Sequence, residues 1–568
     1  MATPFTRDAR QNEAMKKKRQ QNGQDRGNNR MQQNMLTRRA TMAGMLGVAA
    51  GGLAGSHRAF AAVQRPFKYA FANSDLGSAD PINIRASNDD VICRQVFMSL
   101  VSPPYGTGDN ALAHCQPELA ERWESSADRK QWTFFLKRGV MFHRGYGEVT
   151  ADDVKFSFDR VRSLTTGSLY AEGFADLEKV EVLDSHTVRF HLTYSNPIFH
   201  ATHLFPREGG FVVCRKAVEE MGPTAFSRNP VGSGAYEFAG YQPGRQVTLK
   251  ANPNFHRGKP RLDELHFLYM PETAARTIAF RKGDLDFIDG ARAPGWTGDL
   301  KRAMPAAQVR VLFPGSTQIM HLDTSRKPFS DLRVRQAVAH GLNRSVWKEA
   351  YGELSGPLYG MNAPGAFGAL GEKDVPAELH YAYEPERAKA LLKEAGYPQG
   401  LSVDVYISKR EDYTTNMLLI QEQLKKIGIT INLTQVDHAT YHSDNRKDKN
   451  QMIVMSGPNT ETVGRWDATY FAANADVRPD GRGGNNFSHY GVKSPGVDKA
   501  LEEARAEGDA DRQAAMFRAI EVQLLRDLPA VPLQCLGWVW VKQPFVKIPF
   551  ELVSGSLNFP MEGIELEK

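Results

Sequence analysis

Residues 119–161 read LAERWESSADRKQWTFFLKRGVMFHRGYGEVTADDVKFSFDRV. The first half of this stretch is rich in aromatic residues, which predict a buried hydrophobic core and not a ligand cage: Trp123, Trp132, Phe134 and Phe135. The second half contains a helix start signal, because Thr150 is a good N-cap residue and the two acids that follow suit a first turn. We therefore expect a helix to begin at Ala151.

Similar signals recur on both sides of this stretch. Apolar residues alternate with polar ones at 67–71, 187–192 and 247–250, which predicts strands. Ser330-Asp331 predicts a helix over 332–342, and Pro385 predicts another that ends at Gly396 and Pro398. This mixture of strands and helices predicts an α/β protein with more than one sheet.

Further blocks follow in a definite order along the chain. They are NPVGSGAYEFAGYQPGRQVTLKANPNFHRGKPRLDEL from Asn229, KPFSDLRVRQAVAHGLNR from Lys327, YEPERAKALLKEAGYPQG from Tyr383 and IQEQLKKIGI from Ile420. Together with residues 119–161, these blocks resemble the successive signature segments of the family 5 extracellular solute-binding proteins, the peptide and nickel receptors of ABC importers. The resemblance covers essentially the whole chain after its leader.

The resemblance implies a two-lobed periplasmic-binding-protein fold of the class II type, with an extra subdomain in the N-terminal lobe. Mapped onto this chain, lobe I comprises 62–274 plus 529–568, its subdomain spans about 95–230, and lobe II comprises 275–528. Two crossing strands join the lobes, and a small-molecule or peptide ligand is enclosed when they close. A membrane permease, acting with its ATPase, recognises the closed state. We expect a monomer.

The leader reads LTRRATMAGMLGVAAGGLAGSHRAFA from Leu36 to Ala61. Arg38-Arg39, a weakly apolar run and a small-x-small end predict a twin-arginine signal over 1–61, read by the twin-arginine translocase. The apolar run has only 14 residues, too few to span a bilayer stably. No cysteine follows it for lipid attachment, so we expect a soluble periplasmic protein that begins at Ala62.

Charge and cysteine content exclude several other classes of protein. Residues 1–61 hold 11 Lys+Arg against 3 Asp+Glu, so removing this +8 from the whole-chain +6 leaves a charge near −2 and no case for a nucleic-acid partner. Four cysteines without CxxC spacing predict neither a metal site nor a disulfide scaffold. A Cys93–Cys115 disulfide and free thiols both stay open.

Catalytic motifs are missing from the sequence. It contains no GxSxG, no HExxH, no SxxK with its companion triads and no GxxxxGK. We therefore predict a binding protein and not an enzyme, without catalytic residues or a cofactor. The alternative is an exported hydrolase that carries a scattered triad.

The resemblance also implies where the ligand touches the chain. The segment after the first strand, Asn73-Ser74-Asp75, is expected to supply polar contacts. Arg410, after a later strand, is expected to grip a peptide carboxylate through its planar fork. The acid that meets the peptide amine in family members has no direct counterpart here, and the candidates beyond the following strand are Asn459, Glu461 and Asp467.

This departure keeps non-peptide solutes open as ligands, namely opines, glycosides or metal chelates. Arg465 would then attract an anionic or sugar-like solute, and Trp466 would stack on it. Bare metal binding is not predicted. His438 and His442 have the i, i+4 spacing of a metal pair, but the family pattern places them at an exposed helix start away from the cleft.

Overall fold

The computed structural model describes residues 65–84, 86–109, 111–168, 170–206, 209–458, 462–481, 483–555 and 559–567. The twin-arginine signal predicted for 1–61 and two of the predicted ligand residues, Asn459 and Glu461, lie outside these described residues. None of the helices in the described ranges combines the length and the apolar character that crossing a membrane requires. All four cysteines are free thiols.

A nine-stranded mixed sheet runs through the described chain. Its strands, in order, are β10 (Tyr236–Gln242), β11 (Gln246–Ala251), β12 (Glu264–Tyr269), β1 (Phe67–Phe71), β13 (Phe287–Asp289), β19 (Ala530–Lys542), β14 (Gln308–Leu322) and β18 (Met452–Pro458). The short β15 (Ser355–Gly356) also pairs with β19. β1 is parallel to β12 and β13, while β14, β18 and β19 are antiparallel neighbours.

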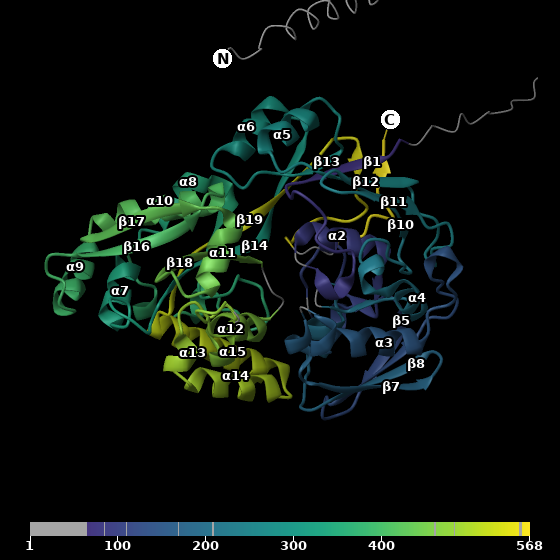
Figure 1. Ribbon diagram of the computed structural model, residues 1–568, viewed down its shortest axis with the longest axis horizontal. Helices are drawn as coiled ribbons and strands as arrows, with labels where there is room; N and C mark the ends of the chain where they lie inside the picture. The colour runs from purple at the N-terminus through teal and green to yellow at the C-terminus, as the bar shows by residue number, and fades with distance from the viewer. Residues whose placement is uncertain are drawn as a thin grey trace, which may run out of the picture. The chain divides into compact units, whose positions relative to one another are not determined.

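The long strands β14 and β19 run alongside each other and connect two hydrophobic cores (Figure 1). Leu312 of β14 and Trp540 of β19 belong to the first core, which is built mainly from residues 67–267. Ile319 of β14 and Val541 of β19 belong to the second core, built mainly from residues 280–541. Because each strand contributes to both cores, the sheet is continuous from one to the other. The lobe boundaries inferred from the sequence remain a proposal.

A separate four-stranded sheet carries the aromatic residues of the opening stretch. Its order is β5 (Ala120–Ser125), β6 (Gln131–Leu136), β8 (Thr187–Leu192) and β7 (Leu177–Asp184), and α3 (Ala151–Val161) packs against β7 and β8 (Figure 1). Trp132 and Phe134 are fully buried, as predicted. The prediction for Phe135 is wrong: strand alternation puts its ring on the other face, under the Arg122 guanidinium.

The second core is covered largely by helices and a parallel strand pair, β16 (Leu401–Ser408) and β17 (Ile429–Val436). The helices are α5 (Thr273–Arg281), α6 (Trp296–Ala303), α7 (Leu332–His340), α8 (Ser345–Tyr351), α9 (Pro385–Glu394), α10 (Glu411–Lys425), α11 (His438–Arg446), α12 (Val463–Phe471), α13 (Tyr490–Lys493), α14 (Gly496–Ala506) and α15 (Ala510–Asp527). In Figure 1, α10 lies beside β16 and β17, and α12, α14 and α15 gather together.

The predicted helix signals are confirmed at three starts. Thr150 donates its hydroxyl to Asp153 at the start of α3, over 2.9 Å. The Asp331 carboxylate accepts the Arg333 N–H at the start of α7, over 2.9 Å. α9 begins at Pro385 and is followed by Gly396 at φ +93°, a conformation that glycine adopts without strain. Only the end of α7 differs from the prediction, by two residues.

Close packing explains the glycines of the 229–235 loop. A Cβ on Gly232 would lie 2.0 Å from the Val96 carbonyl oxygen, and one on Gly234 would lie 2.4 Å from that of Gln95. Both carbonyls belong to the last turn of α2 (Ser87–Val96), and the Gly234 N–H donates to Val96 over 2.8 Å. The loop therefore lies directly on the end of the helix, and only glycine allows that approach.

Candidate functional site

Arg410 lies between the end of β16 and the start of α10, where it meets a buried carboxylate. Its Nε donates to Asp412 Oδ1 over 2.6 Å and its Nη2 to Asp412 Oδ2 over 2.8 Å. The guanidinium also lies 4.8 Å from the centre of the Tyr413 ring. This fork fixes the direction of the Arg410 side chain, which stays 45% exposed and so open to a further partner.

A second guanidinium approaches the same carboxylate from another part of the chain. Arg292 follows β13, and its Nη1 donates to Ser316 Oγ of β14 over 2.6 Å. Its Nη2 lies 3.7 Å from Asp412 Oδ2, and its guanidinium lies 4.3 Å from the centre of the Trp538 ring on β19. Arg292 thus connects β13, β14 and β19 to the start of α10.

The charges of this cluster do not balance. Burial opposes ionisation of Asp412, but the hydrogen bonds and charge of Arg410 hold the pKa of this carboxyl below its usual value. Burial and the Arg410 charge lower the pKa of His438 to about 4, so His438 is neutral at pH 7. Two guanidinium groups therefore approach the one carboxylate of Asp412. Asp289, the other acid whose charge acts on Arg292, is also served by the charge of Arg276, so the excess positive charge favours an anion.

His438, at the start of α11, contacts Arg410, although the family pattern places this helix start away from the cleft. Its Nε2 accepts from Arg410 Nη1 over 3.2 Å, and its Nδ1 lies 2.9 Å from Ser408 Oγ. Both ring nitrogens are engaged, which leaves neither for a metal. Its ring packs 4.5 Å from that of His442, so the i, i+4 pair is a packing contact in this structure.

The loop after β1 is tied to the end of β13 by Asp289. The Tyr69 hydroxyl donates to Asp289 Oδ1 over 2.6 Å and the Ala72 N–H to Oδ2 over 3.3 Å. Arg276 Nε donates to the Asp289 carbonyl over 2.8 Å. Burial raises the pKa of Asp289, although Tyr69 and the Arg276 charge oppose that rise. Arg292 follows three residues later, so this tie also positions the second guanidinium.

The predicted residues Asn73, Ser74 and Asp75 lie in that loop. Asn73 is half-buried and Ser74 is exposed. The Asp75 carboxylate accepts the Tyr241 hydroxyl over 2.8 Å and the Gly244 N–H over 2.8 Å. Burial raises the pKa of Asp75, but these hydrogen bonds outweigh it and the pKa lies below its usual value. Asp75 therefore anchors the loop to the turn between β10 and β11, and its contact with ligand stays a prediction.

Trp466 and Asp467 lie in α12, on its buried side. The Trp466 ring is 1% exposed and packs 4.4 Å from the Tyr470 ring, with the backbone of Gly457 directly against it. Stacking on a solute would therefore require the ring to leave the second hydrophobic core. This burial has a signal in the sequence, because Val463, Trp466 and Tyr470 recur at helical spacing on one face.

Asp467 forms a buried acid pair with Glu521 of α15. The Asn362 amide donates to Asp467 Oδ1 over 3.0 Å and to Glu521 Oε1 over 2.9 Å. Burial, together with the neighbouring Glu521 carboxyl, raises the pKa of Asp467 well above its usual value. The Asp467 side chain is fully buried and already accepts from Asn362, which argues against the predicted contact with a ligand amine.

One group in the described residues has the spacing of metal ligands, namely Asp323, Asp448 and His489. The Arg326 guanidinium already forms ion pairs with both carboxylates of this group. Arg326 Nε lies 2.6 Å from Asp323 Oδ2, and its Nη2 lies 2.9 Å from Asp448 Oδ1. The group is therefore an internal ion-pair cluster, which does not call for a metal.

Sequence reasoning found Arg410 as a candidate and missed Arg292 and Asp412. Their association joins segments 120 residues apart, which no local pattern reports. The one available signal is position, because the Gly290-Ala291-Arg292 run directly follows a short strand that ends at Asp289. Polar residues at strand ends are typical of binding sites in α/β proteins.

Comparison with known proteins supplies the family. The model of the bacterial extracellular solute-binding proteins, family 5 Middle, matches residues 114–475. The di/tripeptide-binding protein 2 of Pseudomonas aeruginosa (strain UCBPP-PA14) is 29% identical over 449 residues, which are 73% of this chain and 80% of that protein.

Solved structures agree with this match. MoaA from A. tumefaciens R10, in complex with mannopinic acid, has 30% identity and a TM-score of 0.78, over 89% of this chain and 100% of MoaA. DppA from Helicobacter pylori, in complex with the peptide STSA, has a TM-score of 0.74 at 23% identity, over 89% of this chain and 98% of DppA, and shows the shared fold.

These matches confirm the resemblance seen in the sequence and the two-lobed periplasmic-binding-protein fold. The family model alone covers more than half of the chain. The protein belongs to the family 5 bacterial extracellular solute-binding proteins.

Proposed function

We propose that this protein captures a small organic solute that carries a carboxylate, and delivers it to the permease of an ABC importer. Arg410 and Arg292 receive the carboxylate. The observation that carries the proposal is the sharing of one carboxylate, that of Asp412, between two guanidinium groups. An incoming carboxylate would balance the remaining positive charge and occupy donors that Asp412 leaves free.

Two ligand classes fit this chemistry. A mannopinic acid complex is known for MoaA, and the P. aeruginosa relative is a di/tripeptide-binding protein. Both solute classes bear a carboxylate, so the Arg292–Arg410 site serves either of them. They differ at the amine of a peptide, for which Asn459 or Glu461 stays the proposed partner, since Asp467 is fully buried and its pKa is raised.

A titration series tests the carboxylate. The purified protein is titrated calorimetrically with mannopinic acid, a dipeptide, a tripeptide and the C-terminal amide of the dipeptide. We expect at least one acid to bind and the amide to bind at least tenfold more weakly than its parent dipeptide, if that peptide is the ligand. Binding of the amide with the affinity of the dipeptide would contradict the proposal.

The proposed transport cycle, in which the lobes close and the permease recognises the closed form, is inferred from the family. The proposed lobes, 62–274 plus 529–568 and 275–528, close around the solute, and the closed monomer is the form that the permease recognises. The proposed role is binding without catalysis. The proposed site of action is the periplasm. There the ligand binds between the two lobes, and the liganded protein delivers it to the permease.

Export through the twin-arginine route is proposed from the leader. Changing Arg38 and Arg39 together to Lys should keep the precursor in the cytoplasm, because the arginine pair is the recognised feature. Cell fractionation with an antibody to the protein measures this. Changing Arg19 and Arg26 to Lys is the matched control, and normal periplasmic accumulation of the Arg38 and Arg39 variant would refute the route.

A further inference from the structure

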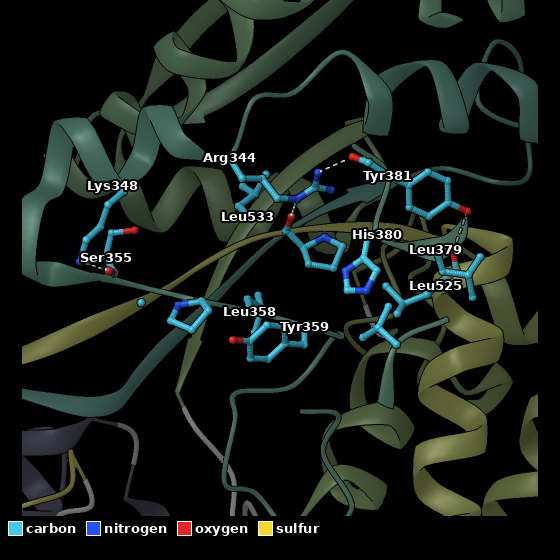
Figure 2. A pocket seen from close by; sticks show the side chains of 14 residues that line it. Arg344, Lys348, Ser355, Leu358, Tyr359, Leu379, His380, Tyr381, Leu525 and Leu533 are labelled. Carbon is cyan, nitrogen blue, oxygen red and sulfur yellow. Dashed lines mark hydrogen bonds between the residues drawn. The ribbon is translucent and has the colours of Figure 1, made fainter. Parts of the chain in front are cut away.

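A cavity of about 410 Å³, separate from the Arg292–Arg410 site, opens among elements of the second core (Figure 2). It lies between α8, β15, the segment 375–381, the end of α15 and the start of β19. Its 14 lining residues all fall within 344–533, and they include none of the Arg292–Arg410 site. A volume of this size is typical of sites for small molecules.

Arg344 lies at the wall of this cavity with neutral partners. Its Nε donates to the Pro532 carbonyl over 3.2 Å and its Nη1 to the Tyr381 carbonyl over 3.1 Å, as Figure 2 shows. A guanidinium has five N–H donors, so these two bonds hold the group in place and leave others for a ligand.

The charge of Arg344 has no counter-ion in this part of the chain. The lining residues contain no Asp or Glu, and among the described residues no carboxylate forms an ion pair with Arg344. Burial lowers the pKa of the guanidinium to about 10, and the group still carries its charge at pH 7. A half-buried cation without a counter-charge carries part of the cost of desolvation, and a bound anion would relieve that cost.

Other lining residues define what the anion must carry. Lys348, whose Nζ donates to the Ser355 carbonyl over 3.2 Å, adds a second positive charge at the same wall. The remaining wall also contains His380 and Tyr381 but is mostly apolar, and its apolar side chains include Leu358, Tyr359, Val375, Leu379, Leu525 and Leu533. The ligand that fits has one acidic end and an apolar body.

We propose that this cavity is a second binding site, for a small organic monocarboxylate with an aromatic or aliphatic body. The carboxylate pairs with Arg344, and the body contacts the leucine-rich wall. The site is independent of the Arg292–Arg410 cluster and of the solute that the cluster captures.

Crystals of the full protein soaked in 4-iodobenzoate test the position of the site. The iodine gives an anomalous signal, and we expect a peak inside the cavity with the carboxylate at Arg344. A peak only beside Arg410, or no peak at all, would overturn the proposal.

Calorimetry with benzoate tests the chemistry in solution. Arg344→Gln should weaken benzoate at least tenfold, and neutral benzamide should bind wild type at least tenfold more weakly than benzoate. Arg387→Gln, which changes an exposed arginine on α9, is the matched control, and Arg410→Ala separates this site from the other. Both should leave benzoate affinity within twofold.

A second variant covers the case in which Arg344→Gln fails to fold. Leu358→Trp replaces an aliphatic side chain with a bulky indole that fills part of the cavity, and it keeps the Arg344 guanidinium. It should abolish benzoate binding while the thermal midpoint stays near that of wild type. Unchanged benzoate affinity in a folded Leu358→Trp protein, or loss of it in Arg410→Ala, would refute the second site.

Discussion

Two histidines illustrate how local surroundings set charge at the scale of single residues. Beside Arg410, burial keeps His438 neutral, with a pKa of about 4. Hydrogen bonds to Asp448 and Asp476 instead raise the pKa of His489 to about 10. His489 Nδ1 lies 2.9 Å from Asp476 Oδ1, and its Nε2 lies 3.2 Å from Asp448 Oδ1. At pH 7, therefore, the His438 imidazole is neutral and the His489 imidazole is charged.

His489 should make stability depend on alkaline pH. Its pKa is raised from 6.5 in the unfolded chain to about 10, so its stabilisation is complete below pH 6.5 and is lost as pH rises toward 10. His489→Asn removes the charge and suits the backbone, whose φ is +55°. Urea unfolding should show a lower stability at pH 6 and a flatter decline between pH 6.5 and 10 than wild type.

The control for that prediction is His114→Gln, which changes a histidine whose side chain is 61% exposed. It should follow the wild-type curve. The same alkaline decline in His489→Asn as in wild type would show that His489 is not the group responsible.

Asp467 should respond to pH through a different cause. Burial and Glu521 raise the pKa of Asp467, so its contribution to stability is complete at acidic pH and falls as pH rises toward the raised value. Asp467→Asn keeps a neutral group of the same shape. We expect its thermal midpoint to exceed that of wild type at pH 8 by more than at pH 5. An equal difference at both pH values would argue against a raised pKa of Asp467.

At the scale of elements, the loop at 229–235 is fixed by contact with the end of α2. Gly234→Ala would place a methyl group against the backbone of that helix, and overpacking of this kind costs about 1–3 kcal/mol. The urea midpoint should fall accordingly. Gly240→Ala on the adjacent β10 is the control, because nothing lies within 4 Å of its Cβ position. A Gly234→Ala protein as stable as the control would mean that the loop moves away without cost.

The arrangement of elements also explains why the ligand residues come together. β1, β13 and β14 bring Tyr69, Arg292 and Ser316 to one region, and the start of α10 brings Asp412 to the same region. The hydrogen bond of Ser316 with Arg292 and the tie of Tyr69 to Asp289 hold these strand ends in place. Rigid elements of this kind position a binding site more accurately than free loops do.

At the scale of the whole molecule, residues 170–195 contact residues 465–508 outside the proposed ligand site. The Arg465 guanidinium of α12 lies 5.5 Å from the centre of the Tyr170 ring, and a Cβ on Gly508 would lie 2.7 Å from Ser195 Oγ. A groove beside this contact is lined by residues of 173–203 and 462–517. These contacts would add stability to a closed form.

Removing the contact between Arg465 and Tyr170 should therefore lower the affinity for the ligand, although Arg465 does not contact the ligand in this proposal. A cation–π contact contributes about 0.5–2 kcal/mol, so Arg465→Ala should lower the affinity for the solute roughly 2- to 30-fold. Small-angle scattering in the presence of ligand should show a larger radius of gyration for Arg465→Ala than for wild type. Arg512→Ala, at an arginine 72% exposed, is the control. Unchanged affinity and radius in Arg465→Ala would exclude this contact from closure.

The sequence predicted the family, the helix starts at 151, 332 and 385, and the strand at 67–71, because caps, glycines and alternation act locally. The pairing of Arg292 with Asp412 depends on strand order across the sheet, and the order is a property of the whole chain. The burial of Trp466 and Asp467 follows from the way α12 packs on α14 and α15. Composition alone could not separate a buried helix face from a ligand wall.

In the proposed function, Arg292 and Arg410 capture the carboxylate of the transported solute. The most direct test is calorimetric titration of wild type, of Arg292→Ala with Arg410→Ala, and of the exposed control Arg387→Ala with mannopinic acid, dipeptides and tripeptides. The account predicts that at least one of these acids binds wild type and the control alike, and that the double variant loses at least tenfold in affinity. Equal affinity in the double variant, or no binding of any acid to wild type, would contradict it.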